Sequence, residues 1–167
     1  MTRHREAGMG SLPKVPTRLR LDLAADAEIV RDIRCQLEEF IAPLPLSIDE
    51  VEGLEVALSE ACNNAICHGS PLGRTNRIRV ECWLDHDLLV LEVEDEGGSV
   101  PRTALRRGPP DDWQTSGRGL YLMRQFTDAL VFKVNDAGLV VRMVKRIPHS
   151  GSQPIEHING EFYHASA

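Results

Sequence analysis

One helix, predicted over roughly residues 48 to 68, constrains the fold of this chain more than any other segment. Ser47 and Glu50 fit a capping box at its start, and Gly69 marks its end. Apolar residues recur between these limits at helical spacing, as a single stripe: Val51, Leu54, Leu58, Ala61 and Ala65. We therefore expect this stripe to face the hydrophobic core.

Polar residues gather beside the stripe at the end of the same helix. Glu60 and Asn64 are four residues apart, so a helix places both on one face, with His68 one turn further on. A carboxylate, an amide and an imidazole on one face can form a site. The same residues also suit an ordinary solvated helix face, so this segment alone does not decide between the two.

Alternating and helical patterns predict the remaining elements. Residues 25–41 have helical spacing that ends before Pro43 and Pro45, and a third helix opens at Gly117 and runs to about Asp128. Strands are indicated by alternation of polar and apolar residues over five segments: 18–23, 77–84, 88–93, 129–134 and 139–145. This order predicts an α+β, two-layer sandwich, in which helices cover one face of a mixed, mostly antiparallel sheet.

Composition indicates one domain. The chain has 167 residues, of which 42% are hydrophobic, enough to close a core without a metal or disulfides. We predict a domain over residues 17–147 between a flexible N-terminal tail, 1–16, and a C-terminal tail, 148–167. The net charge of -6 and the lack of a basic stripe argue against nucleic-acid binding.

Cysteine usage and hydropathy indicate a cytoplasmic protein. The four cysteines contain no CxxC pair, and Cys35, Cys62 and Cys67 fall within helical patterns, where cysteine usually packs as a small hydrophobe. No apolar run approaches the ~18 residues of a membrane span, and the N-terminus has no secretory signal pattern. A reduced, cytoplasmic protein is the expectation.

Glycines follow the strand predicted at 88–93. Asp95 stands at the strand end, and Gly97 and Gly98 after it let the backbone approach a ligand. An ordinary acidic turn is the alternative. Residues 100–118 have no hydrophobic period, as expected of a mobile lid or of a passive surface loop.

A glycine pair opens the third helix. Gly117 and Gly119 precede an apolar run, and free backbone N–H groups at such a helix start suit a phosphate. Glycines that serve helix packing would leave the same pattern.

Together, three motifs give this chain a recognisable signature. They resemble, in order and approximate spacing, the N, G1 and G2 boxes of the ATP-binding superfamily of gyrase, histidine kinases and MutL: Glu60-x-x-x-Asn64, Asp95-x-Gly97 and Gly117-x-Gly119-Leu120. Within that superfamily, residues 64–69 and 119–124 look most like the anti-sigma factor serine kinases of the RsbW and SpoIIAB type. The likeness covers roughly residues 18 to 146 and implies a Bergerat-type fold that binds ATP and Mg²⁺.

The resemblance also implies roles for individual residues. Glu60 would be the general base on the attacking serine hydroxyl, Asn64 would hold Mg²⁺, and Asp95 would accept a hydrogen bond from the adenine amino group. The implied nucleotide contacts are completed by Gly97, Gly98, Ser116, Gly117, Arg118, Gly119 and Leu120. The lid would close over the nucleotide.

Two departures from the family pattern concern the nucleotide. Ser99 stands where the family often has a second glycine, and Gly138-Leu139 replaces a Gly-Thr pair, which removes a hydroxyl from the adenine side. Neither departure affects Glu60 or Asn64.

The resemblance implies an anti-sigma factor that phosphorylates a STAS-type antagonist with Mg-ATP, binds a sigma factor or similar regulator, and forms a homodimer. A weakly catalytic or non-catalytic module that sequesters its partner is the alternative. A histidine kinase is disfavoured, because the chain has no room for a phospho-accepting histidine helix.

Overall fold

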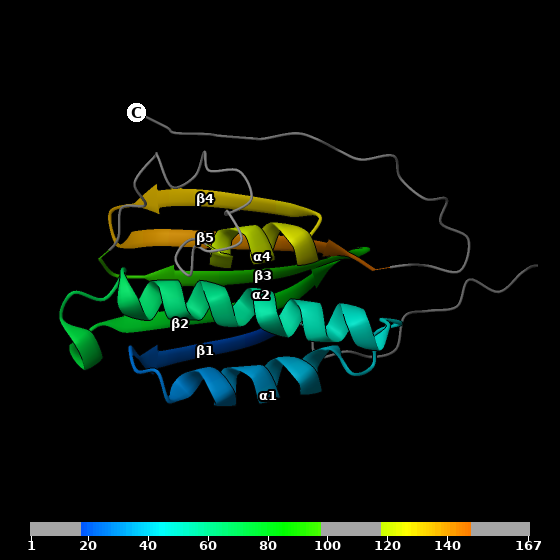
Figure 1. Cartoon of the computed structure of the whole chain (residues 1–167), viewed down its shortest axis with the longest axis horizontal. Coiled ribbons are helices and arrows are strands. Elements are labelled where there is room, and N and C mark those ends of the chain that lie inside the picture. The colour runs from blue at the N-terminus through cyan, green and yellow to red at the C-terminus, as the bar shows by residue number, and fades with distance from the viewer. Residues whose placement is uncertain (1–17, 98–117, 148–167) are drawn as a thin grey trace, which may run out of the picture.

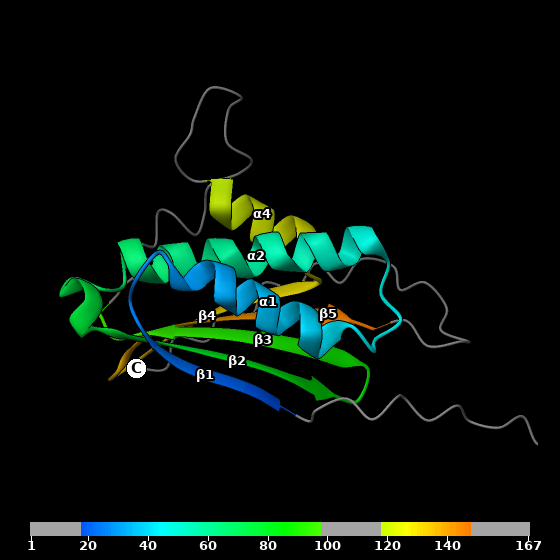
Figure 2. The same ribbon diagram turned by 90° about the horizontal axis from the view of Figure 1, so that it is seen from below.

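The computed structural model describes residues 18–97 and 118–147. Helices α1, α2 and α4 lie together on one face of a sheet, in two layers (Figures 1 and 2). The elements follow one another along the chain as β1 (Arg18–Ala24), α1 (Ile29–Ile41), α2 (Ile48–Cys67), a short 3₁₀ turn η1 (Gly73–Thr75), β2 (Arg77–Asp85), β3 (Leu88–Asp95), α4 (Arg118–Phe126), β4 (Ala129–Asn135) and β5 (Gly138–Arg146). The predicted α+β class is confirmed.

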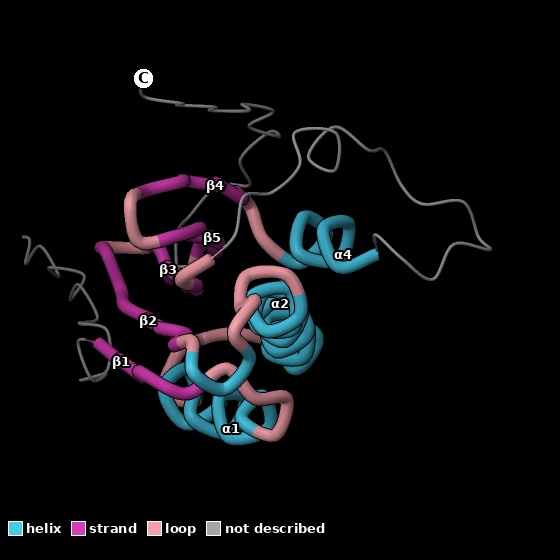
Figure 3. The backbone as a smooth tube through the Cα atoms, turned by 90° about the vertical axis from the view of Figure 1, so that its left-hand side faces the viewer, coloured by secondary structure: helices cyan, strands magenta, loops and turns pink. Residues whose placement is uncertain are grey.

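The sheet has the strand order β1-β2-β3-β5-β4. The sequence predicted a mixed, mostly antiparallel sheet. Every pair of described strands is antiparallel. Two of the four pairs, β2–β3 and β4–β5, are hairpins, each of which returns the chain antiparallel to itself, and β1–β2 and β3–β5 pair strands that helices separate in the chain. The second hairpin inserts β5 beside β3, with Val93 opposite Val141. The end view in Figure 3 shows the sheet and the helices as separate layers.

Helix α2 supplies the centre of the core. Four of its five predicted stripe residues are buried, at Leu54, Leu58, Ala61 and Ala65, and Val51 is half-buried. They pack in one cluster with the inner side chains of the sheet: Ile78, Val80, Leu91, Val93 and Met143. Burial of this stripe stabilises the helix on the sheet.

The capping box predicted at Ser47 forms. The Glu50 backbone N–H donates to the Ser47 hydroxyl at 3.3 Å, and the Glu50 carboxylate accepts from the Ser47 backbone N–H at 2.9 Å. The hydrogen bonds from Ser47 lower the pKa of the Glu50 carboxyl, and the one from the Ser47 backbone N–H has the largest effect. The helix therefore starts where the sequence predicts.

Two helix boundaries differ from prediction. Helix α1 begins at Ile29 rather than at residue 25, because the Asp26 carboxylate accepts the Glu28 N–H at 3.1 Å and the Ala25 N–H donates to the Asn76 carbonyl at 2.9 Å. Helix α4 ends at Phe126 rather than at 128, where the chain turns into β4. In both places a local or tertiary hydrogen bond replaces a helical one.

The face of the sheet opposite the helices carries charged pairs. Trp83 lies there between the guanidinium groups of Arg18, 5.0 Å from its ring centroid, and Arg142, 5.6 Å from it. Arg142 also donates to Glu92 at 2.7 Å. The predicted alternation of strand residues thus separates an apolar inner face from a polar outer one.

All four cysteines are free thiols, two of them buried and two exposed. Cys62 and Cys82 are buried, and burial raises the pKa of each thiol to about 12, so both remain protonated at neutral pH. Cys35 and Cys67 are exposed, so the expectation that every cysteine in a helical pattern packs inside is wrong for these two.

We predict that Ser47→Ala lowers the free energy of unfolding by about 1 kcal/mol, because the Glu50 N–H at the start of α2 loses its side-chain acceptor and the Glu50 carboxylate loses the Ser47 hydroxyl. Urea denaturation measures the change. Ser59→Ala is the control, since its hydroxyl donates within the helix to the Glu55 carbonyl at 2.6 Å. An equal effect of both substitutions would contradict a special role for the cap.

Candidate functional site

Glu60 and Asn64 lie on the same face of α2, as predicted, and both are half-buried. The start of α4 packs against Glu60. A Cβ atom added to Gly119 would lie 2.5 Å from Glu60 Oε2. Glycine at residue 119 therefore lets the α4 backbone reach the Glu60 carboxylate.

The end of α2 lies against Asp95 at the end of β3. Gly69 donates its N–H to the Asn64 carbonyl at 3.3 Å, and a Cβ added to Gly69 would lie 2.1 Å from Asp95 Cγ. Glu60, Asn64 and Asp95 thus follow one another along α2 and across to the sheet.

Asp95 is 3% exposed, and backbone donors surround its carboxylate. Its Oδ1 atom accepts the N–H groups of Gly97 at 3.1 Å and of Leu139 at 3.4 Å. A Cβ added to Gly138 would lie 1.8 Å from the Asp95 carbonyl oxygen. Glycines at residues 69 and 138 therefore leave the space in which Asp95 is held.

Gly97 is exposed, but one side of it packs closely on a neighbouring loop. A Cβ there would lie 2.5 Å from Pro71 Cδ and 2.9 Å from the Gly69 carbonyl oxygen. The turn after β3 therefore packs on the loop after α2, and any side chain at residue 97 would separate them.

The structure describes only part of the third predicted motif, Gly117-x-Gly119-Leu120. Arg118, Gly119 and Leu120 form the first turn of α4, with Arg118 exposed and the other two partly exposed. The predicted contacts at Gly98, Ser116 and Gly117, the departure at Ser99, and most of the predicted lid lie outside the described residues, as do the two predicted tails.

The structure adds neighbours that sequence reasoning missed. Gly69 was expected as a helix end and not as the neighbour of Asp95. Asn76 and Glu96 were not singled out, although the Asn76 side chain donates to Glu96 Oε2 at 3.2 Å. His68 is the C-cap of α2, and it is exposed.

Comparison with known proteins identifies the family. Residues 23–145 match the model of the histidine kinase-like ATPase domain. The chain is 30% identical over 135 residues to an anti-sigma F factor of Clostridium perfringens, covering 78% of this chain and 96% of the relative. It is 31% identical over 129 residues to the serine-protein kinase RsbW of Bacillus licheniformis, covering 72% of this chain and 80% of that one.

The chain belongs to this ATPase family, in the group of RsbW and the anti-sigma F factors. Solved structures share the fold. The RsbU and RsbW domains of a Mycobacterium tuberculosis protein superpose with a TM-score of 0.59 at 20% identity, covering 85% of this chain and 34% of the other. A chain of the SiaB–SiaC complex from Pseudomonas aeruginosa gives 0.59 at 17% identity, covering 75% and 88%.

Leu139, which follows Gly138 where the family pattern has a Gly-Thr pair, contacts Asp95. Leu139 is 7% exposed, and its backbone N–H is the group that reaches Asp95. At 3.4 Å this hydrogen bond is long, because 2.9–3.0 Å is usual for N–H···O. The contact of residue 139 with Asp95 is thus a backbone one, and the leucine side chain belongs to the hydrophobic core.

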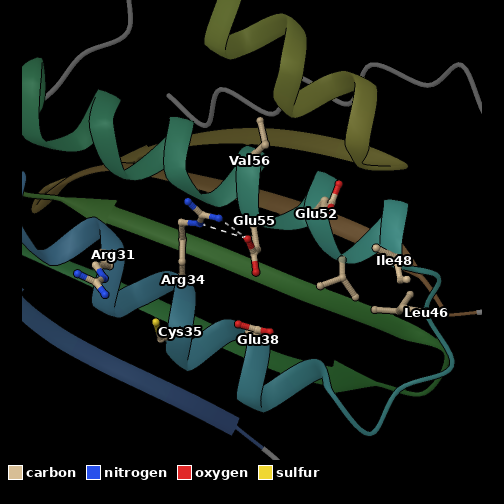
Figure 4. Close-up of a pocket in the computed structure, with 10 residues that line it drawn as sticks. Arg31, Arg34, Cys35, Glu38, Leu46, Ile48, Glu52, Glu55 and Val56 are labelled. Atoms are coloured by element: carbon tan, nitrogen blue, oxygen red, sulfur yellow. Dashed lines mark hydrogen bonds and ion pairs between the residues drawn. The ribbon is translucent and has the colours of Figure 1, made fainter.

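A groove between α1 and α2 lies apart from the family motifs (Figure 4). It is lined by Arg31, Arg34, Cys35, Glu38, Leu46, Ile48, Val51, Glu52, Glu55 and Val56. Arg34 spans it and donates to Glu55 at 2.5 Å, a hydrogen bond that raises the pKa of Arg34. None of the predicted site residues lines this groove.

Among the helices of residues 18–97 and 118–147, none is long and apolar enough to cross a membrane. The same residues contain no group of three or more His, Cys, Asp or Glu side chains placed to hold a metal ion.

We predict that Gly138→Ala lowers the free energy of unfolding by at least about 3 kcal/mol, because φ is +151° there and the added Cβ meets the Asp95 carbonyl oxygen. Gly73→Ala is the matched control. Its φ is +57°, but nothing lies within 4 Å of the added Cβ, so we expect a loss of about 1 kcal/mol. Urea denaturation of both variants measures the difference, and equal losses would contradict the close approach of β5 to Asp95.

Proposed function

We propose that this protein is a serine/threonine kinase that transfers the γ-phosphoryl group of ATP to a STAS-type antagonist and that also binds a sigma factor or a similar regulator. The observation that carries the proposal is the joint arrangement of Glu60, Asn64 and Gly119, with the start of α4 against the Glu60 carboxylate. Relatives with the names anti-sigma F factor and serine-protein kinase RsbW support it.

The adenine end of the proposed site is at Asp95. Its carboxylate would accept a hydrogen bond from the adenine amino group, and Gly97 would leave room for the base. The buried position of Asp95 between Gly69 and Gly138 supports this role, because a carboxylate enclosed in this way keeps a fixed direction.

The phosphate end of the proposed site is at the start of α4. The N–H groups of Gly117, Arg118, Gly119 and Leu120 would face the phosphates, with Ser116 and Gly98 completing the contacts. Mg²⁺ would rest on the Asn64 amide oxygen together with phosphate and water oxygens, since this ion keeps several waters and needs few protein ligands.

Glu60 would accept the proton of the attacking hydroxyl. As the serine or threonine oxygen bonds to the γ-phosphorus, the bond from phosphorus to the β,γ-bridging oxygen breaks and ADP leaves. Glu60 is half-buried and one turn from Asn64, so base and metal ligand would face the same phosphate.

Partners, assembly and location complete the proposal. Phosphorylation would stop the antagonist from capturing the kinase and leave the kinase free to hold its sigma factor. We expect a homodimer, as in related kinases, and a cytoplasmic location, where ATP and sigma factors are present.

A second candidate function is partner sequestration without rapid phosphoryl transfer. The Gly138-Leu139 pair favours it, because a missing hydroxyl beside Asp95 would weaken adenine recognition, lower nucleotide affinity and leave protein contacts intact.

We predict that Glu60→Ala lowers phosphorylation of the antagonist by at least about 100-fold, since the general base is lost. The antagonist is incubated with Mg-ATP and the purified kinase, and the added phosphate is followed by intact mass. Complex formation with the antagonist should be retained. Glu52→Ala, on the exposed face of the same helix, is the control and should remain active.

A wild-type protein that binds both nucleotide and antagonist but adds no phosphate would contradict the kinase proposal and support sequestration. Full activity of Glu60→Ala would contradict the assignment of the base alone.

We further predict that Leu139→Thr tightens ATP binding by about threefold to tenfold, because the new hydroxyl can donate to the Asp95 carboxylate beside the base. Leu139→Val controls for the change of shape without a hydroxyl. Calorimetric titration with Mg-ATP measures both. Equal affinities of the two variants would show that the missing hydroxyl does not limit nucleotide binding.

A further inference from the structure

Glu96 lies between two residues of the proposed nucleotide site, Asp95 and Gly97, and its side chain points to the other side of the strand end. Glu96 is exposed, whereas Asp95 is buried. Alternation along the strand separates the two side chains, so Glu96 is free to make contacts outside the site.

Two donors hold the Glu96 carboxylate. Its Oε2 atom accepts the Arg77 backbone N–H at 2.8 Å and the Asn76 side-chain amide at 3.2 Å. Both donors lower the pKa of Glu96, the Arg77 N–H having the larger effect, so the ionised form is the one that is bound. The carboxylate therefore links the turn after β3 to the residues that lead into β2.

Asn76 is a fixed anchor for this link. It is 7% exposed, and its Oδ1 atom accepts the Leu72 N–H at 2.8 Å. Its backbone N–H donates to the Gly73 carbonyl at 2.9 Å, and its carbonyl accepts the Ala25 N–H at 2.9 Å. With every polar group engaged, Asn76 has one position relative to the loop after α2.

That loop also contacts the site directly. Gly97 lies against Pro71 and the Gly69 carbonyl, and Gly69 lies against the Asp95 carboxylate. These are close packing contacts, which the lack of a side chain at Gly69 and Gly97 permits. The Glu96 hydrogen bonds supply the directional part of the same junction.

We propose that Glu96 is a positioning residue for the nucleotide: through Asn76 and the Arg77 N–H, its carboxylate holds the Asp95–Gly97 turn at one distance from the end of α2. The adenine partner on β3 and the magnesium ligand on α2 then keep a fixed spacing. This inference rests on the proposed nucleotide binding at that site.

The test compares three substitutions at Glu96 in the full chain, with Mg-ATP binding measured by calorimetric titration. Glu96→Ala should weaken binding by about tenfold. Glu96→Gln should stay within about twofold of wild type, because its amide oxygen accepts the same two hydrogen bonds. Glu96→Asp keeps the charge on a side chain one methylene shorter, and should weaken binding as Glu96→Ala does.

Glu94→Ala is the matched control. Glu94 lies on the same side of the strand, two residues earlier, and carries the same charge, but its carboxylate pairs with Arg79 at 2.5 Å. Its removal should leave ATP binding within about twofold of wild type. Thermal unfolding without nucleotide checks that each variant is folded.

The outcomes separate the two proposals. ATP binding by wild type with unchanged affinity in Glu96→Ala and Glu96→Asp would overturn the positioning role alone. Equal losses in Glu96→Gln and Glu96→Ala would also overturn it, since hydrogen-bond acceptance would then not be what matters. No ATP binding by wild type would overturn the proposed nucleotide function, and this inference with it.

Discussion

The burial of the Asp95 carboxylate is the constraint on which the structure around the candidate site depends. A charged group removed from water is costly unless hydrogen bonds replace its hydration, and Gly97 and Leu139 provide N–H groups for this purpose. Leu139 can do so because the β4–β5 hairpin inserts β5 beside β3. Gly69 and Gly138 have no side chains to occupy the same space. The strand order therefore brings a hydrogen-bond donor to the Asp95 carboxylate, and the two glycines leave room for Asp95.

Helices α2 and α4 pack against each other through one glycine on each helix. Gly53 on α2 faces Phe126, and an added Cβ would lie 2.5 Å from its ring; Gly119 on α4 faces Glu60 in the same way two turns along. The helices run antiparallel between these contacts, and each supplies one glycine and one larger side chain. The surroundings of Glu60 thus depend on the packing of α4 as a whole.

The residues proposed for phosphoryl transfer and the residue proposed for adenine recognition belong to different parts of this fold. The residues proposed for phosphoryl transfer belong to α2 and α4, whereas Asp95 and the departure at Leu139 belong to the sheet. A change at the sheet can weaken nucleotide binding and leave the helices intact. The proposed kinase activity and the alternative of partner sequestration would therefore use the same architecture.

The sequence by itself determined the elements, the capping box at Ser47 and the α+β class, because periodicity, caps and turns are local properties. It also placed Glu60 and Asn64 on one face. The antiparallel pairing of β3 with β5, the enclosure of Asp95 by Gly69 and Gly138, and the link from Glu96 to Asn76 were decided only by the tertiary structure. Those contacts join residues about 20 or more apart in the chain, and no local pattern records which distant groups a fold brings together.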